Sequence, residues 1–124
     1  MDHSYESADS AQSGKFLCKA DSLVEGEFRE LEARQDDRPI FLVATRHKGT
    51  VQAWLNVCPH QGRPLNWAPD RFLTDNDGQL VCSHHGAVFE PTQGLCISGP
   101  CKNAKLTAVE LLEINGKLFL TPDP

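Results

Sequence analysis

Two short stretches of this 124-residue sequence combine the residue types that bind transition metals. The first, "CPH", contains Cys58 and His60, and the second, "CSHHG", contains Cys82 followed by His84 and His85. Thiolate and imidazole side chains are ligands of zinc, copper and iron–sulfur clusters. A lone cysteine near a histidine is common by chance, but two such pairs in one short chain are not. The two stretches therefore predict one metal site with cysteine and histidine ligands.

The kind of metal site is indicated by the ligand types, because each stretch pairs a cysteine with a histidine. Glycine stands close behind each pair, at Gly62 and Gly86, and lets backbone amides approach a bound group closely. Structural zinc sites usually gather cysteine pairs and histidine pairs, so mixed pairs favour two irons bridged by two sulfides. A zinc-held interaction module is the alternative that the residues leave open. Both histidines of "CSHHG" also stay open as the ligand, because the first of them repeats the Cys-x-His spacing of "CPH".

Short strands must position these two stretches, because apolar residues occur in brief runs separated by Gly, Pro, Asn and Asp. Phe28 and Leu31 are the expected inward residues of the second run. Asn115-Gly116, between two apolar runs, is typical of a type I′ hairpin turn. The expected strands and hairpins cover 15–20, 27–33, 39–45, 51–57, 79–82, 89–97, 108–114 and 117–121.

The predicted fold class is all-β, an antiparallel β-sandwich or small barrel. Helix signals are weak and amount to single turns at 22–25 and 102–105, because no segment keeps a 3.6-residue period. Residues 15–124 are long enough for one domain with one modest core. Residues 1–14 are rich in Ser and Asp and are predicted to be a disordered polar tail.

Composition narrows the function classes. The formal net charge of −5 argues against nucleic acid as a partner, because phosphate binding needs a basic face. No apolar stretch has the length of a bilayer span, and the N-terminal residues lack the basic start and apolar run of a signal peptide. A soluble cytoplasmic protein without membrane or nucleic-acid partners is expected.

The other cysteines and the tryptophans can be explained by packing, without a functional role. Because the cytosol is reducing, five cysteines do not predict a disulfide framework. Cys18, Cys96 and Cys101 lie in or beside strand-like segments and are expected to pack as small hydrophobic residues. Oxidative pairing of Cys96 with Cys101 is the alternative, and the reducing compartment argues against it. Trp54 and Trp67 are expected in core and loop packing.

The two stretches and a third loop resemble the Rieske 2Fe–2S proteins, whose pattern is C-x-H, a spacer and C-x-x-H, with a Gly-Pro loop downstream that covers the cluster. Here "CPH" is followed by "GRPL", and "CSHHG" by "FEPTQGLCISGP". The resemblance implies a Rieske-type fold with two cluster-binding loops, one 2Fe–2S cluster and a cover that contains Gly99-Pro100. It implies four cluster ligands: Cys58, His60, Cys82 and His85.

The resemblance also distinguishes the two adjacent histidines. It implies that His85, directly before Gly86, is the ligand, and that His84 packs or shields near the cluster. The spacer between the two motifs is longer than the family usually has. The turn-rich "RFLTDNDGQ" is expected to absorb the extra length as a longer hairpin.

The expected reduction potential depends on charge. Two ferric ions, two sulfides and two thiolates sum to zero with neutral imidazoles, so such a cluster accepts an electron more readily than a four-cysteine cluster, within roughly −150 to +300 mV. High-potential family members carry Ser and Tyr at the positions of Ala87 and Phe89, and disulfide-forming cysteines at those of Arg63 and His84. Their absence here implies the low-potential, ferredoxin-like branch.

The resemblance therefore predicts a Rieske-type ferredoxin, which carries one electron between a reductase and an oxygenase or other redox enzyme. We do not expect an enzyme by itself, because a Rieske oxygenase needs a further iron held by two histidines and a carboxylate. Beyond the implied ligands only His3, His47 and His84 remain. The alternative is a small Rieske-like subunit of a larger reductase, such as nitrite reductase.

Overall fold

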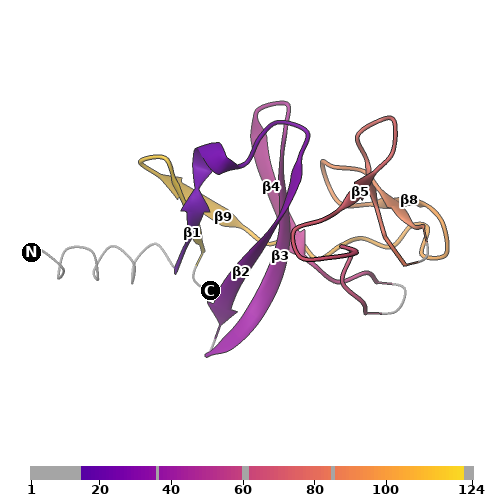
Figure 1. Ribbon diagram of the computed structural model, residues 1–124, viewed down its shortest axis with the longest axis horizontal. Helices are drawn as coiled ribbons and strands as arrows, with labels where there is room; N and C mark the ends of the chain where they lie inside the picture. The colour runs from indigo at the N-terminus through magenta and orange to yellow at the C-terminus, as the bar shows by residue number, and fades with distance from the viewer. Residues whose placement is uncertain (1–14, 36, 60–61, 85, 122–124) are drawn as a thin grey trace, which may run out of the picture.

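The computed structural model describes residues 15–35, 37–59, 62–84 and 86–121, and its strands form three antiparallel sheets in the orders β1-β10-β9, β2-β3-β4 and β5-β6-β7-β8. The sheets follow one another along the long axis of the molecule (Figure 1). The strands are β1 (Lys15–Lys19), β2 (Phe28–Gln35), β3 (Arg38–His47), β4 (Thr50–Leu55), β5 (Leu73–Thr74), β6 (Leu80–Val81), β7 (Val88–Phe89), β8 (Cys96–Ser98), β9 (Leu111–Ile114) and β10 (Lys117–Leu120). The predicted all-β antiparallel class is confirmed.

The central sheet, β2-β3-β4, is buried on both faces. Successive residues of a strand point to opposite faces, and Leu42, Val43 and Ala44 of β3 are all fully buried. Leu42 and Ala44 belong to a core shared with β1 and β10, whereas Val43 belongs to a core shared with β6 to β8. This double burial explains the unbroken apolar run in 39–45, because a strand covered on both faces does not alternate.

The sheet β5-β6-β7-β8 packs against β4 through Trp54. The Trp54 side chain is 2% exposed, which confirms its predicted place in the core. Gly94, in the turn between β7 and β8, lies directly on the indole: a Cβ there would stand 2.6 Å from Nε1 of Trp54. The β7–β8 hairpin, which leads to the third predicted loop, therefore packs against the central sheet.

Most of the predicted elements coincide with observed ones. Every expected strand region contains an observed strand, and Phe28 and Leu31 are buried as predicted. Asn115 and Gly116 have φ of 54° and 77°, which are the left-handed values that a type I′ turn needs. The long spacer between the two cysteine motifs contains the β5–β6 hairpin, in which the Gly78 amide donates a hydrogen bond to the Asp75 carbonyl at 3.1 Å.

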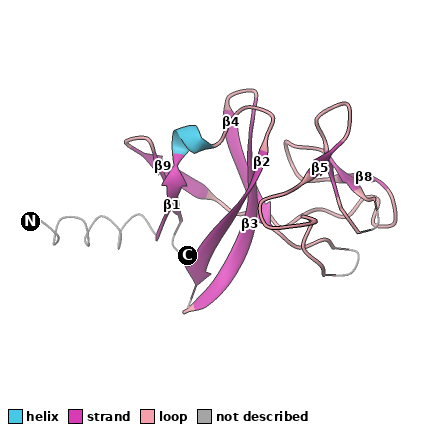
Figure 2. Ribbon diagram, in the orientation of Figure 1, coloured by secondary structure: helices cyan, strands magenta, loops and turns pink. Residues whose placement is uncertain are grey.

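The observed helical turns differ from the predicted ones. The first is a 3₁₀ turn, η1 (Ala20–Ser22), which overlaps the predicted 22–25 at Ser22 alone (Figure 2). The predicted turn at 102–105 is a hydrogen-bonded turn and not a helix. The predicted disordered tail, 1–14, lies outside the described residues. In the part of the chain that is described, no helix is long and apolar enough to cross a membrane.

Candidate metal centre

The two cysteine motifs form loops with the same backbone hydrogen bonds. In the first, the Cys58 amide donates to the Arg63 carbonyl at 2.7 Å, and the Gly62 amide returns to the Cys58 carbonyl at 2.8 Å. In the second, the Cys82 amide donates to the Ala87 carbonyl at 2.7 Å, and the Gly86 amide returns to the Cys82 carbonyl at 3.0 Å. Each loop thus closes four and five residues after its cysteine, so both thiols occupy equivalent positions.

Glycine is required in these loops for its backbone conformation. Gly62 and Gly86 have φ of +72° and +74°, which L side chains adopt only with strain. A Cβ at either position would meet no atom of the described residues within 4 Å. The tight return of the chain, rather than crowding, therefore explains the glycine that follows each motif.

The two loops are joined through Leu65, which is fully buried. The Leu65 carbonyl accepts the Ser83 amide at 3.2 Å and the Ser83 hydroxyl at 2.8 Å. The Leu65 amide donates to Oδ1 of Asn56, which is buried at the end of β4, at 2.9 Å. The second loop is therefore anchored to the first, and the first to the central sheet. Sequence reasoning missed these residues, because no local pattern marks a bond between distant loops.

The third loop contacts both of the others. A Cβ on Gly99 would stand 2.8 Å from Cα of Ala87, so the third loop lies directly against the second. The Cys101 thiol contacts the Cys58 thiol of the first loop and lies 3.3 Å from the Cys96 thiol of β8. The described parts of 58–63, 82–87 and 99–101, which we call the three-loop end, converge at one end of the molecule.

The thiol at the centre of this convergence is held in its neutral form. Burial, followed by the Cys96 and Cys58 thiols beside it, raises the pKa of Cys101 to about 12. Cys96 is fully buried, as predicted, whereas Cys18 and Cys101 are only partly buried.

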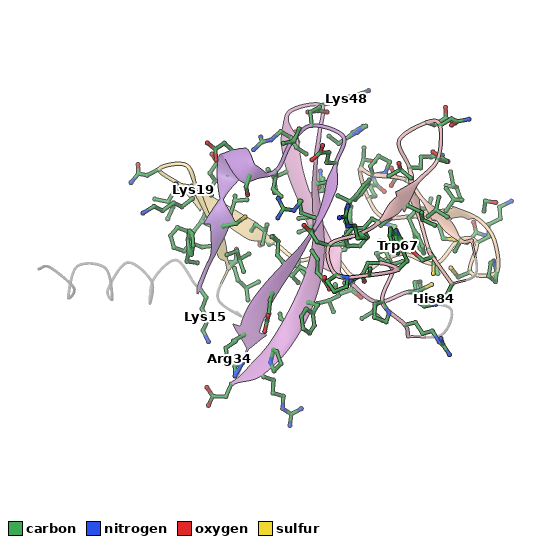
Figure 3. The ribbon with its side chains drawn as sticks, viewed as in Figure 1. Lys15, Lys19, Arg34, Lys48, Trp67 and His84 are labelled. Carbon is green, nitrogen blue, oxygen red and sulfur yellow. The ribbon has the colours of Figure 1, made fainter. Side chains whose placement is uncertain are left out.

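The implied ligands fall partly inside the described residues. Cys58 and Cys82 are each 1% exposed and belong to the same core cluster. His60 and His85 lie outside the described residues. His84 is exposed on the second loop, at the end opposite Lys15 and Lys19 (Figure 3), so its side chain is not packed. Among described residues no three Cys, His, Asp or Glu side chains are grouped to hold a metal.

The two thiols that the structure describes suit the cysteine half of a mixed 2Fe–2S cluster. Two thiols are withdrawn from water on equivalent loops, as the cysteine-bound iron requires. The histidines of the two motifs stand inside those same loops, between each cysteine and its glycine.

The turn before the third loop is organised by Glu90. Its carboxylate accepts the amides of Thr92 at 2.9 Å and Gln93 at 2.6 Å, and also the Thr92 hydroxyl. Burial acts to raise the pKa of Glu90, but the hydroxyl and amide donors together outweigh it and lower the pKa. In its charged form, this carboxylate therefore holds together the hairpin "PTQG" that the sequence predicts.

The surface near the three-loop end is partly apolar and partly basic. Val57 and Trp67 are 45% and 59% exposed, and Arg63, Lys102 and Lys105 are exposed. The prediction that Trp67 packs in a loop is wrong, because 59% of its side chain is exposed.

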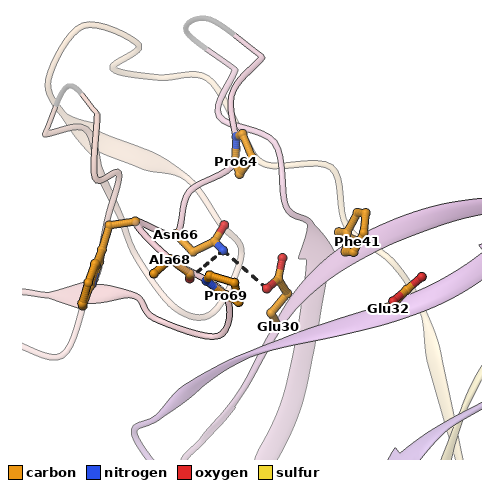
Figure 4. Close-up of a pocket in the computed structure, with 8 residues that line it drawn as sticks. Glu30, Glu32, Phe41, Pro64, Asn66, Ala68 and Pro69 are labelled. Atoms are coloured by element: carbon orange, nitrogen blue, oxygen red, sulfur yellow. Dashed lines mark hydrogen bonds between the residues drawn. The ribbon is translucent and has the colours of Figure 1, made fainter.

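An open hollow of about 550 Å³ lies beside this surface (Figure 4). It separates β2 and β3 from the loop that follows the first motif. The Asn66 side chain bridges it by donating a hydrogen bond to Glu30 at 3.4 Å, and it also donates to the Ala68 carbonyl of its own loop at 2.9 Å. Glu30, Glu32, Phe41, Pro64, Asn66, Trp67, Ala68 and Pro69 line it. The hollow adjoins the three-loop end but contains neither thiol.

Comparison with known families gives one match, the model of the Rieske [2Fe-2S] domain, over residues 14–114. That range contains both cysteine motifs and the third loop. The corresponding comparison with curated protein sequences found no significant match.

Solved structures share the fold. The ferredoxin of Sphingomonas yanoikuyae B1 superposes with a TM-score of 0.67 at 20% identity, over 87% of this chain and 97% of that chain. A chain of the complex of reduced oxygenase and oxidized ferredoxin in carbazole 1,9a-dioxygenase gives 0.64 at 24% identity, over 86% and 99%. The terminal oxygenase of carbazole 1,9a-dioxygenase from Nocardioides aromaticivorans IC177 gives 0.65 at 19% identity, over 89% of this chain and 30% of the oxygenase.

Proposed function

The chain belongs to the Rieske [2Fe-2S] domain family, and we propose that it is a soluble cytoplasmic ferredoxin that carries one electron from a reductase to an oxygenase. Family membership implies one 2Fe–2S cluster. We therefore set aside the alternative of a zinc-held interaction module. When bound, such a cluster accepts and releases a single electron. The residues 15–124 are the proposed extent of the domain.

Cys58, His60, Cys82 and His85 are the proposed ligands. The observation that carries this proposal is the pair of buried thiols on loops with matching hydrogen bonds. The protein's contribution is to hold both thiols in equivalent positions, to exclude water from them and to cover them with the third loop. Such a rigid surrounding suits electron transfer, because little has to move when the charge changes.

The ligand proposal is tested by composition and by substitution. We expect the purified protein to be red-brown, with two irons and two acid-labile sulfides per chain. Cys58→Ser and Cys82→Ser should give colourless protein with a lower melting temperature, because a bound cofactor stabilises only the folded state. Cys18→Ser, in β1 at the opposite end, is the matched control and should keep the cluster. A colourless native protein with one zinc would contradict the proposal.

The adjacent histidines are separated by a second pair of variants. His84→Ala should retain the visible spectrum, because the His84 side chain is exposed, whereas His85→Ala should lose it. Retention in His85→Ala together with loss in His84→Ala would move the ligand to His84.

The oxygenase partner is supported by the solved structures, several of which are complexes of an oxygenase with a ferredoxin. The exposed Arg63, Lys102 and Lys105 give this end of an acidic chain a local positive charge. Opposite charges steer the encounter of two proteins, and salt weakens that steering. Electron transfer to the partner is therefore expected to slow as ionic strength rises.

The oxygenase component of a carbazole 1,9a-dioxygenase is a practical acceptor for this test. Stopped-flow reoxidation of the reduced protein should be several-fold slower for Lys102→Glu and Lys105→Glu than for the native chain. Lys15→Glu and Lys19→Glu reverse the same charge at the opposite end (Figure 3) and should leave the rate unchanged. Equal rates in all four variants would contradict docking at the three-loop end. Obligate copurification with a large subunit from the source cells would favour the reductase-subunit alternative.

A further inference from the structure

The thiols of Cys96 and Cys101 contact each other at the base of the third loop, with their Sγ atoms 3.3 Å apart. We propose that they form an oxidisable dithiol, which a small disulfide such as oxidised glutathione converts into an intramolecular disulfide. The site is distinct from the four proposed ligands and goes beyond the proposed electron transfer. Transient disulfides of this kind occur in reducing compartments, where permanent structural ones do not.

The two thiols are already close, and the backbone around them is hydrogen-bonded. A disulfide has its sulfurs about 2.05 Å apart, so the pair must approach by only about 1.3 Å. The Cys96 amide and carbonyl are bonded to Ala104 and Asn103, each at 2.8 Å, and the Ala104 amide is bonded to the Cys101 carbonyl at 2.9 Å. The backbone thus already holds the two residues across a closed turn.

The order of reaction follows from burial. Cys101 is partly exposed, whereas Cys96 is fully buried, so the oxidant reaches Cys101 first. Only the small thiolate fraction that the raised pKa of Cys101 leaves near neutral pH can react, so this first exchange is slow. The Cys101 thiolate attacks one sulfur of oxidised glutathione and releases one glutathione thiolate. The Cys96 sulfur, on losing its proton, then attacks the Cys101 sulfur and releases the second. Two protein thiols are oxidised, one glutathione disulfide is reduced to two thiols, and the two protons pass to those thiols.

Cys58 is the competing partner, because its thiol also contacts Cys101. In the protein that holds its cluster, Cys58 is a proposed iron ligand, which leaves Cys96 as the thiol that can react. We therefore expect a disulfide between Cys96 and Cys101, and none between Cys101 and Cys58.

The bridge would hold the segment that lies on the second loop. Gly99, between the two cysteines, packs against Ala87, so a link between Cys96 and Cys101 restricts the opening of this cover. Restricting the less ordered state is the main way in which a disulfide stabilises. This consequence rests on the proposed cluster, whereas formation of the bridge does not.

The test uses the cluster-bound protein and oxidised glutathione. After incubation, free thiols are alkylated, the protein is digested, and linked peptides are identified by mass spectrometry, while the visible spectrum is recorded. We expect a Cys96–Cys101 link, loss of this pair from the alkylated thiols and an unchanged spectrum. A Cys58–Cys101 link with bleaching, a lasting glutathione adduct on Cys101, or no reaction would each overturn the proposal.

Substitutions and a second readout separate the bridge from nonspecific oxidation. Cys101→Ser should abolish the link, and Cys18→Ser, which removes the remaining partly exposed thiol, should leave it intact. A chelator should bleach the oxidised protein more slowly than the reduced protein, and Cys101→Ser should show no such difference. Equal bleaching rates in the native chain would overturn the restraint on the cover, while the linked peptide reports the bridge independently of any cluster.

Discussion

Glu30 and Asp70 each bind the backbone of the other. The Glu30 amide donates to Oδ1 of Asp70 at 2.8 Å, and the Asp70 amide donates to Oε1 of Glu30 at 3.0 Å. Arg29 reinforces the pair with an ion pair to Asp70 of 2.9 Å. This reciprocal pair ties β2 to the loop that follows the first cysteine motif, so it fixes where that loop leaves the central sheet.

Asp70→Ala is expected to destabilise the fold by about 1–2 kcal/mol, because it removes bonds to a charged acceptor at a half-exposed site. Asp70 also has φ of +60°, a conformation that Asn tolerates and Ala does not. Asp70→Asn should therefore cost less than Asp70→Ala in a urea titration. Asp77→Ala, in the β5–β6 turn, is the control for simple loss of an exposed carboxylate. Equal stabilities of the native chain and Asp70→Ala would show that the Glu30–Asp70 pair does not contribute to the free energy of unfolding.

Gly99→Ala tests the contact between the third loop and the second. At φ +101°, with a Cβ only 2.8 Å from Cα of Ala87, the substitution imposes both backbone strain and a clash. Gly116→Ala imposes strain at φ +77° but no clash, since no described atom lies within 4 Å of its Cβ. Both variants should lose about 1 kcal/mol from strain, and only Gly99→Ala should also lose its cluster faster to a chelator. Equal bleaching rates for the two variants would argue against the cover.

Much of this architecture was predictable because it is local. The Asn115-Gly116 turn, the hairpin at "PTQG" and the two cysteine motifs depend on residues within a few positions of one another. The same reasoning placed Phe28 and Leu31 inward. The residue types in the two motifs predicted a mixed cysteine and histidine site, and the resemblance of both motifs and the third loop to the Rieske proteins predicted the family, which the family model confirms.

The parts that escaped prediction depend on partners far along the chain. Glu30 and Asp70 are 40 residues apart, and Ser83 bonds to Leu65 across two loops, so neither relationship leaves a periodic trace. Trp67 looked like a packing residue by its type alone, and only the structure shows that its side chain is exposed. The two-residue strand β5 is too short to carry any alternation.

Acid should weaken the hairpin that carries the third loop. The pKa of Glu90 is lowered from its ordinary value of 4.5, so its contribution to stability is present above that value and is lost as the pH falls through the folded-state pKa. Glu90→Gln should flatten the decline in stability below about pH 4.5, measured by urea unfolding at several pH values. Glu113→Gln, on exposed β9, is the control. If Glu90→Gln declines as steeply as the native chain, the carboxylate does not carry this pH dependence.

Phe89→Tyr should raise the reduction potential. Phe89 is 1% exposed and shares a buried core with Cys58 and Cys82, at the position where high-potential members of the family carry a hydroxyl. A hydroxyl that donates toward the cluster favours the more negative, reduced state. If it favours that state by about 1.4 kcal/mol, the one-electron potential rises by about 59 mV.

Protein-film voltammetry measures this shift, and Phe119→Tyr is its matched control. Phe119 is also an aromatic residue of a buried core, but it lies in β10 with its ring against Phe16, in the sheet farthest from the three-loop end (Figure 1). The control should change neither the potential nor the visible spectrum. The native midpoint should lie in the lower part of the roughly −150 to +300 mV range, because neither Ala87 nor Phe89 supplies a donor. An intact spectrum with an unchanged midpoint in Phe89→Tyr, or a native midpoint near the top of that range, would show that something other than these side chains sets the potential.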